Sequence, residues 1–306
     1  MTKMHATALD IDNDLVSRLV AEQFPQWSAL PLVAVPSPGT NNALFRLGPR
    51  LVVRLPLLER AIRQLDKDFS WLPRLAPHLP VAVPEPVAKG RPALGYPWSW
   101  GVYRWLDGRT APATGLADSA AVPALAGFVT ALHALDLPDG PPARRGVPLL
   151  AQDAGARDAI DQLTDTYDRA TLTQLWDEAL AAPGWDRPPT WLHGDLGPGN
   201  VLLRDGALTA VIDFGGLGVG DPACDAIPAW SLVPPTAREA FRRALRLDDA
   251  TWSRGRGWAL SISLMQLPYY WDSNPFLKAN SIHVINEIIR ERFGPKHVPP
   301  TLTDQV

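Results

Sequence analysis

Cysteine is almost absent from this sequence, because Cys224 is the single thiol among 306 residues. A disulfide framework within the chain is therefore excluded, and the composition is typical of a reducing compartment. No histidine lies close to Cys224 in the sequence. We therefore expect this thiol to be a small buried residue and not a nucleophile.

Long apolar runs are also lacking, so the sequence predicts no helix that spans a bilayer. The first residues include Asp10, Asp12 and Asp14, and this acidic start does not fit a signal peptide. Together these absences predict a cytoplasmic protein that does not contact a membrane.

Neither sign of charge dominates, since the formal net charge is -3 and the isoelectric point is about 6.1. This balance gives no reason to expect a nucleic-acid partner. The 32 prolines interrupt many potential helices. A chain of 306 residues can nevertheless bury a sizeable core and form two domains or lobes.

Two polar loops stand out between Thr190 and Trp230, each directly after an apolar segment. The first loop reads His193-Gly-Asp-Leu-Gly-Pro-Gly-Asn200, and the second begins with Asp213-Phe-Gly. Strands that end side by side would bring these loops together. The pattern therefore predicts that a carboxylate, a carboxamide and a second carboxylate converge on one point.

This set of groups suits phosphoryl transfer, which asks a protein for positioning and charge neutralisation. Asp195 is the candidate general base, because a carboxylate can accept the proton of a substrate hydroxyl. Asn200 and Asp213 offer one neutral and one anionic oxygen, and Mg²⁺ prefers such ligands together with water and phosphate. Either string alone is weak evidence, but both in this order are a strong signal.

The two loops resemble those of the aminoglycoside phosphotransferase family, small-molecule kinases with a protein-kinase-like fold. Protein kinases have H-R-D-x-x-x-x-N followed by D-F-G, whereas this family usually has a glycine where Gly194 stands. The sequence Asp221-Pro-Ala-Cys-Asp225 is similar to the family's D-P-x-x-D stretch, and His193 is implied to brace the metal-binding segment. The resemblance covers most of the chain.

The resemblance implies a bilobal α/β (α+β) fold. Residues 1–106 would form a small nucleotide-binding lobe built on an antiparallel sheet and ending in a hinge. Residues 107–306 would form a mainly helical lobe that carries catalysis and the acceptor site. Apolar patterns agree with this division: a helix is expected from Asp12 or Asn13 to Phe24, followed by short strands near 32–35, 43–47 and 50–55.

A glycine-rich G-x-G-x-x-G loop is missing at the place where a kinase covers the ATP phosphates. The loop between the first two expected strands has one glycine, Gly39, followed by Thr40 and Asn41. The resemblance implies that these residues donate hydrogen bonds to phosphate. An ordinary hairpin turn is the alternative, because glycine and asparagine favour turns.

Arg54 occupies the position of the kinase lysine that contacts the nucleotide phosphates. Its permanent charge and forked guanidinium can bind two phosphate oxygens. The next expected helix, from Glu59 to about Leu75, offers acidic partners, among which we favour Asp68. Glu59 and Asp66 are more simply explained as a solvated helix face.

The segment from Trp100 to Gly108 resembles the last strand of the small lobe and its hinge. Hinge backbone groups hydrogen-bond adenine in such kinases, and the match places these groups at Arg104, Trp105 and Leu106. Trp105 would stack on the base or fill the junction between the lobes, the commoner fate of a tryptophan.

Acceptor-binding residues are the least specified part of the sequence. An acidic row on one or two helices between 153 and 182 suits a cationic aminoglycoside, and a solvated helix face is the alternative. Aromatic residues in a break between two later helices, at 252–267 and 281–293, also suit an amine or a sugar; aromatic core is the alternative. These candidates are Asp161, Asp165, Tyr269, Tyr270, Trp271 and Asp272.

We therefore predict a kinase that uses Mg²⁺ and either ATP or GTP to phosphorylate a hydroxyl on a small molecule. If the acceptor is an aminoglycoside, it would be cationic, and the role of the protein would be antibiotic resistance. One alternative is a metabolite kinase of the same fold that acts on choline, homoserine or a sugar amine. Another is a nucleotide-binding pseudokinase. Both a monomer and a homodimer are compatible with the sequence.

Overall fold

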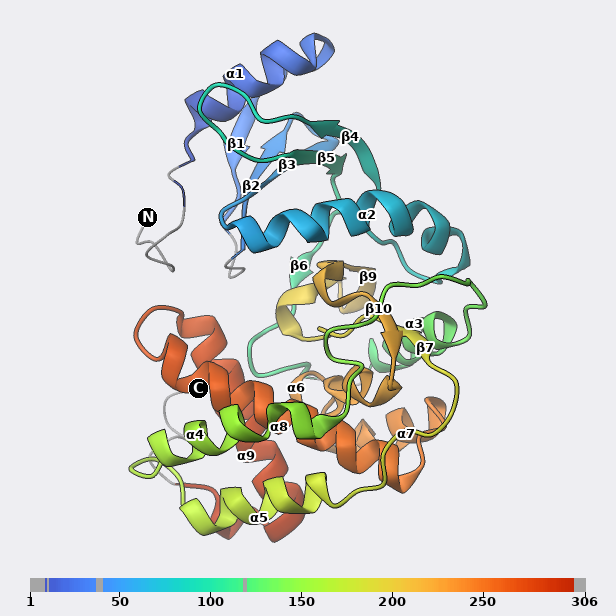
Figure 1. Ribbon diagram of the computed structural model, residues 1–306, viewed down its shortest axis with the longest axis vertical. Coiled ribbons are helices and arrows are strands. Elements are labelled where there is room, and N and C mark those ends of the chain that lie inside the picture. The colour runs from blue at the N-terminus through green and yellow to red at the C-terminus, as the bar shows by residue number, and fades with distance from the viewer. Residues whose placement is uncertain (1–8, 10, 37–40, 118–119, 300–306) are drawn as a thin grey trace.

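Five antiparallel strands form a sheet in the N-terminal part of the molecule (Figure 1). The structure, a computed structural model, describes residues 9, 11–36, 41–117 and 120–299. The strand order is β1-β2-β3-β5-β4, and every neighbouring pair is antiparallel. The strands are Leu32–Ala34 (β1), Asn42–Leu47 (β2), Leu51–Pro56 (β3), Pro86–Gly90 (β4) and Trp100–Arg104 (β5).

Side chains alternate between the two faces of β3, as expected for a strand. Val53 and Leu55 are fully buried in an apolar cluster that includes residues of helix α1, Asn13–Gln23. Arg54 points to the other face, where its guanidinium contacts helix α2, Ile62–Leu75. Figure 1 shows α1 and α2 on opposite sides of the sheet. The alternation of one strand thus separates a core face from a polar face.

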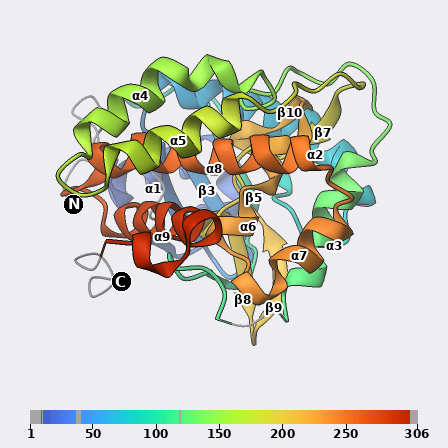
Figure 2. The ribbon, with the colours of Figure 1, turned by 90° about the horizontal axis from the view of Figure 1, so that it is seen from below.

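The rest of the chain is mainly helical and packs around α8, Asp249–Tyr270, whose inner positions are fully buried. Figure 2 shows α8 between the pair α4 and α5 on one side and α9 on the other. The other helices are Val122–His133 (α3), Asp153–Gln162 (α4), Arg169–Leu180 (α5), Pro228–Ser231 (α6), Pro235–Ala244 (α7) and Pro275–Phe293 (α9). No helix in the described ranges is long and apolar enough to cross a membrane.

Several helices begin after an acidic or amide side chain that accepts a hydrogen bond from a backbone N–H three residues later. Such a cap satisfies a donor that the first turn of a helix leaves unpaired. The capping residues are Asp12 (α1), Asp168 (α5), Asp248 (α8) and Asn274 (α9).

Two small sheets lie between the N-terminal sheet and the helices. One has the order β6-β8-β9 and the other pairs β7 with β10, all antiparallel. Their strands are Arg109–Thr110 (β6), Thr190–Leu192 (β7), Val201–Arg204 (β8), Ala207–Val211 (β9) and Gly218–Gly220 (β10). The loops that follow β7 and β9 are the two polar loops singled out in the sequence.

The helix boundaries differ from the expected ones in the last third of the chain. Helix α8 continues through Pro268 to Tyr270, although the sequence predicted an end at Leu267. A proline removes one N–H donor from a helix, and here the apolar packing around α8 holds the helix together beyond it. Helix α9 begins at Pro275 and not at Ser281, because Asn274 caps it and proline suits a first helical turn.

Candidate active site

The loop after β7 is shaped by Asp225, which lies fully buried behind it. Its carboxylate accepts the backbone N–H of His193 at 2.9 Å and that of Gly194 at 2.8 Å. Gly194 has a positive φ of 75°, and an added Cβ would lie 2.9 Å from the carbonyl oxygen of Gly216. Only glycine fits this turn without strain, which explains why no arginine stands at this position.

Burial alone would raise the pKa of Asp225. The hydrogen bond from His133 and the nearby charges nevertheless hold this pKa below its ordinary value. The neighbouring Asp221 binds Arg254 through two hydrogen bonds of 2.7 and 3.1 Å. Cys224 is fully buried, and burial raises the pKa of its thiol, so it stays protonated. These groups support the loop and lie behind it.

His193 links the two polar loops and is itself fully buried. Its Nδ1 accepts the backbone N–H of Asp195 at 3.2 Å, and its Nε2 lies 3.1 Å from the carbonyl oxygen of Ile212. The first contact requires a bare Nδ1, so the proton resides on Nε2 and is donated to Ile212. The imidazole therefore fixes the spacing between the segment at Asp195 and the segment before Asp213.

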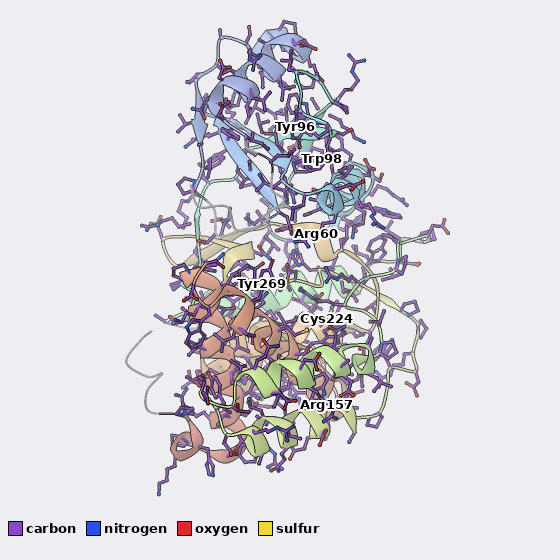
Figure 3. All side chains as sticks on the ribbon, turned by 60° about the vertical axis from the view of Figure 1, so that its left-hand side comes forward. Arg60, Tyr96, Trp98, Arg157, Cys224 and Tyr269 are labelled. Atoms are coloured by element: carbon purple, nitrogen blue, oxygen red, sulfur yellow. The ribbon has the colours of Figure 1, made fainter. Side chains whose placement is uncertain are left out.

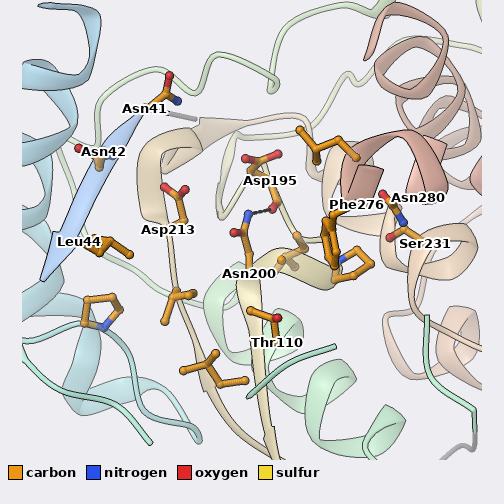
Figure 4. Close-up of a pocket in the computed structure, with 18 of the residues that line it drawn as sticks. Asn41, Asn42, Leu44, Thr110, Asp195, Asn200, Asp213, Ser231, Phe276 and Asn280 are labelled. Atoms are coloured by element: carbon orange, nitrogen blue, oxygen red, sulfur yellow. Dashed lines mark hydrogen bonds between the residues drawn. The ribbon is translucent and has the colours of Figure 1, made fainter. Parts of the chain in front are cut away.

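Asp195, Asn200 and Asp213 line one cavity of about 720 Å³ between the N-terminal sheet and the helices (Figure 4). The amide Nδ2 of Asn200 donates to the carbonyl oxygen of Asp195 at 2.8 Å, which turns the amide oxygen away from that carbonyl. Asp213 has a left-handed φ of 61°, and its Oδ1 accepts from Gln64 at 2.5 Å. The structure thus brings these three predicted side chains together.

The donor set fits a magnesium ion that is shared with a nucleotide. No group of three or more His, Cys, Asp or Glu side chains suited to a metal occurs within the described ranges. Asn200 and Asp213 instead present two hard oxygen groups to the cavity. Mg²⁺ commonly keeps several waters and takes one or two carboxylates plus substrate phosphates. A site with few protein ligands is therefore the expected kind.

Arg145 is a site residue that the sequence did not reveal. It lies in the loop between helices α3 and α4, where no strand or helix spacing marks it. Its Nη1 donates to the carbonyl oxygen of Gly194 at 3.0 Å and makes a short hydrogen bond to Oδ1 of Asp195. Burial opposes its charge, but Asp195 raises the pKa of Arg145 above the ordinary arginine value.

On the sheet side of the cavity, Arg54 Nη1 donates to Oδ2 of Asp68 at 2.8 Å and its Nη2 lies 3.5 Å from Oδ1 of Asp213. Tyr103 donates a second hydrogen bond to Asp68 Oδ2 at 3.0 Å. Asp68 is only 1% exposed, and its burial raises its pKa to about 6 in spite of Arg54. The guanidinium of Arg54 therefore lies between Asp68 of helix α2 and Asp213 of the second polar loop.

The hinge candidates Arg104, Trp105 and Leu106 also line the cavity. The N–H of Arg104 donates to Glu85 at 3.0 Å and that of Trp105 to Arg50 at 2.9 Å. The N–H of Leu106 makes no backbone hydrogen bond within the described residues. Leu106 therefore offers the free backbone donor of this segment.

The other candidates are divided between the cavity and its surroundings. Asn41 and Tyr270 line the cavity. Gly39 and Thr40 lie outside the described residues. The remaining acceptor candidates do not line it: Asp161, Asp165, Tyr269, Trp271 and Asp272. Gln64 was missed, although its position one helical turn before Asp68 on α2 placed it on the same face.

Comparison with known proteins decides the family. The model of the phosphotransferase enzyme family matches residues 33–258, which is most of the chain. The chain belongs to this family. The expected resemblance to the aminoglycoside phosphotransferases and the expectation of a phosphotransferase are thereby confirmed. No curated protein sequence matches the chain significantly.

Solved structures of similar fold agree with this family. The GDP complex of aminoglycoside 2'-phosphotransferase-IIIa has a TM-score of 0.75 at 21% identity, over 92% of this chain and all of that one (100%). The complex of the phosphotransferase APH(2")-IIia with GDP and kanamycin has a TM-score of 0.71 at 20% identity. The match covers 91% of this chain and 99% of that one. Macrolide 2'-phosphotransferase from Brachybacterium faecium has a TM-score of 0.57 at 22% identity, covering 89% and 97%. The protein-kinase-like fold is confirmed.

Proposed function

We propose that this phosphotransferase transfers the γ-phosphate of ATP or GTP to a hydroxyl group of a small molecule. The observation that carries the proposal is the convergence of Asp195, Asn200 and Asp213 on one cavity. That cavity extends from the N-terminal sheet to helices α8 and α9, so it has room for a nucleotide and an acceptor side by side. Complexes with GDP, ADP and ATP are known for proteins of similar fold.

Asp195 is the proposed general base. Its side chain is 45% exposed, and one carboxylate oxygen is held by Arg145. The second oxygen, Oδ2, makes no hydrogen bond within the described residues and is available to an acceptor hydroxyl. A base of this kind must lie within hydrogen-bond reach of the proton that it removes. Arg145 would then orient the base and not take the proton itself.

Asn200 and Asp213 are the proposed ligands of Mg²⁺. When bound, the ion would neutralise charge on the β- and γ-phosphates. Gln64 and Arg54 occupy Oδ1 of Asp213, so Oδ2 is the oxygen left for the metal. Arg54, together with the loop of Gly39, Thr40 and Asn41, would contact phosphate.

We further propose that residues 1–106 bind the nucleotide and residues 107–306 bind the acceptor. Two apolar clusters support this division, because one is built from residues before the hinge. The second cluster also takes in Leu72 and Leu75, so the end of α2 packs with the helical part. The free N–H of Leu106 is the proposed contact to the base of the nucleotide.

Replacing Asp195 with Asn tests the proposal directly. We expect the Asp195→Asn variant to bind MgATP nearly normally while turnover falls about 10²–10⁴-fold, the usual loss when a general base is removed. Release of ADP in the presence of a hydroxylated acceptor and calorimetry with the nucleotide measure the two effects. Wild-type kcat in the variant would contradict the assignment of Asp195 as the base, whereas a wild-type protein without Mg²⁺-dependent turnover would favour the pseudokinase alternative.

A further inference from the structure

The part of the cavity that faces α8 and α9 is lined by uncharged side chains. We call this part the acceptor half. It lies on one side of Asp195, whereas Asn42 and Leu44 of β2 lie on the other (Figure 4). Its principal residues are Ile262, Ser263, Gln266, Phe276, Leu277 and Asn280.

The charged groups around the whole cavity are mostly cationic. Six arginines and two aspartates line it among the described residues, and no glutamate, lysine or histidine joins them. Asp195 is already bound by Arg145, and Asp213 by Gln64 with Arg54 nearby. Among the residues that the structure describes, the acceptor half therefore has no carboxylate of its own to receive an ammonium group.

The acidic row between residues 153 and 182 does not compensate for this lack. Asp161 binds Arg169 at 2.7 Å, and Asp177 and Asp153 both bind Arg157 at 2.8 Å. In Figure 3, Arg157 lies in the helical part away from the N-terminal sheet, whereas Arg60 lies near the junction. These three carboxylates are paired and lie outside the cavity lining, and Asp158 and Asp165 of the same row also lie outside it.

The groups that the acceptor half does offer suit hydroxyls and apolar surface. The amide of Gln266 makes no hydrogen bond to a described residue, so it can bind an acceptor hydroxyl. Ile262, Phe276 and Leu277 present apolar surface beside it. Arg144, which also lines the cavity, is exposed and forms no ion pair within the described ranges. A polycation would meet this charge without compensation, whereas an anion would gain from it.

From these observations we infer that the acceptor is a hydroxylated compound with an apolar face that is uncharged or anionic, and not a polycationic aminoglycoside. The inference rests on the proposed kinase function and narrows its substrate class. Burying several ammonium groups in a cavity with six arginines is unfavourable when the only unbound carboxylate oxygens among its described lining residues are those proposed for the acceptor hydroxyl and Mg²⁺, because a buried charge needs a partner. Apolar surface and a few placed hydrogen-bond groups are the ordinary lining of a small-molecule site.

Calorimetry with kanamycin tests the exclusion of polycations. The protein is saturated with Mg²⁺ and a non-hydrolysable ATP analogue, so the result does not depend on turnover. We expect a dissociation constant for kanamycin above about 100 µM, whereas a smaller value overturns the inference.

A gain-of-function variant tests the physical cause. Gln266→Glu adds one carboxylate to the acceptor half, and we expect it to bind kanamycin about five- to tenfold more tightly than the wild type. Gln162→Glu makes the same chemical change on the exposed end of α4 and serves as the matched control. Equal binding by both variants, or no gain with Gln266→Glu, overturns the proposed role of the missing carboxylate.

Turnover separates this inference from the kinase function itself. ADP release is measured with kanamycin, with an uncharged nitrophenyl glucoside and with an anionic nitrophenyl glucuronide. We expect the highest kcat/KM with one of the last two, and Arg144→Ala should raise the KM of the glucuronide but not of the glucoside. Efficient phosphorylation of kanamycin would establish the kinase and overturn the inference. If no Mg²⁺-dependent ATP hydrolysis occurs with or without these acceptors, the kinase function fails and the kanamycin titrations alone decide the inference.

Discussion

Arg145 shows how a single side chain can set the geometry of a proposed catalytic base. It spans the carbonyl of Gly194 and the carboxylate of Asp195, so it couples the base to the turn before it. Arg145 is separated from Asp195 by 50 residues and lies in a loop without periodicity. Contacts of this kind depend on the folded chain, which is why sequence patterns predicted the candidate base and not the arginine that contacts it.

We predict that Arg145→Ala lowers kcat about 10- to 100-fold, because a base that is misplaced by about 1 Å loses this much. The KM for the nucleotide should change little, since Arg145 makes no hydrogen bond or ion pair with Arg54 or Asp213. Arg145→Lys should recover part of kcat, because an ammonium group can donate hydrogen bonds in place of Nη1 but is carried on a more flexible stem than the planar guanidinium. Steady-state kinetics and a thermal melt check this. A variant with lowered stability and unchanged kcat would show a structural role only.

Burial raises the pKa of Asp68 to about 6, so its ionisation should affect activity in the range where the enzyme can be assayed. The ionised form holds Arg54, so kcat/KM for the nucleotide should fall as the pH drops below about 6. In the Asp68→Asn variant this part of the pH profile should disappear and the plateau should be lower. Rates measured between about pH 5 and pH 8 decide the point, and an identical acid limb in both proteins would assign it to another group.

The same raised pKa affects stability in the opposite direction: activity should fall as the pH drops, whereas the contribution of Asp68 to the free energy of unfolding rises. A carboxyl group with a raised pKa binds more protons in the folded state than in the unfolded state between its two pKa values. Its contribution to the free energy of unfolding is therefore full below its ordinary pKa and is lost as the pH rises through about 6. Above that pH, the ionised Asp68 pairs with Arg54, but keeping this charge buried lowers the free energy of unfolding.

At the scale of elements, α2 connects the sheet to the two polar loops. Asp68 reaches Arg54 on β3, Gln64 reaches Asp213, and Lys67 donates to the carbonyls of Gly215 and Leu217 at 2.9 Å each. These residues lie three or four positions apart or side by side, so one helix surface serves both partners. The sequence predicted the helix and Asp68, because charge and spacing are local. It did not predict the contacts of Gln64 and Lys67, which depend on how α2 meets the later loops.

The hinge after β5 gives an element-level prediction. If the free N–H of Leu106 binds the base of the nucleotide, Leu106→Pro removes one hydrogen bond worth about 0.5–1.5 kcal/mol, or roughly a 2- to 10-fold rise in the KM for the nucleotide. Leu106→Ala keeps the N–H and is the control, with a KM near that of the wild type. Equal effects of both changes would point to the side chain and not to the backbone donor.

At the scale of the whole molecule, the sequence predicted the order of strands, helices and polar loops along the chain. It predicted less well the surfaces at which these elements pack against one another. The loops at Asp195 and Asp213 were recognised because each follows an apolar strand and carries a compact motif. The acceptor half was not, because it is assembled from α8 and α9, whose ends were expected elsewhere. Residues such as Gln266 and Phe276 have no sequence signal for a site; only the packing of two helices brings them beside Asp195.

Binding of MgATP across the cavity should stabilise the whole fold, because a ligand that binds only the folded state adds free energy by mass action. At about 100 times the dissociation constant this stabilisation is ~2.7 kcal/mol, and for a chain of 306 residues we expect a rise in Tm of about 4 °C. Asp213→Asn should lose most of the Mg²⁺-dependent part of that rise, because a neutral amide is a weaker ligand for a hard cation. Asparagine tolerates the left-handed backbone at this position, so the variant should fold.

Asp161→Asn, outside the cavity, is the matched control. Melting curves with ATP plus Mg²⁺ and with ATP plus a chelator measure the effect, and an unchanged Mg²⁺ increment in Asp213→Asn would remove Asp213 from the metal site.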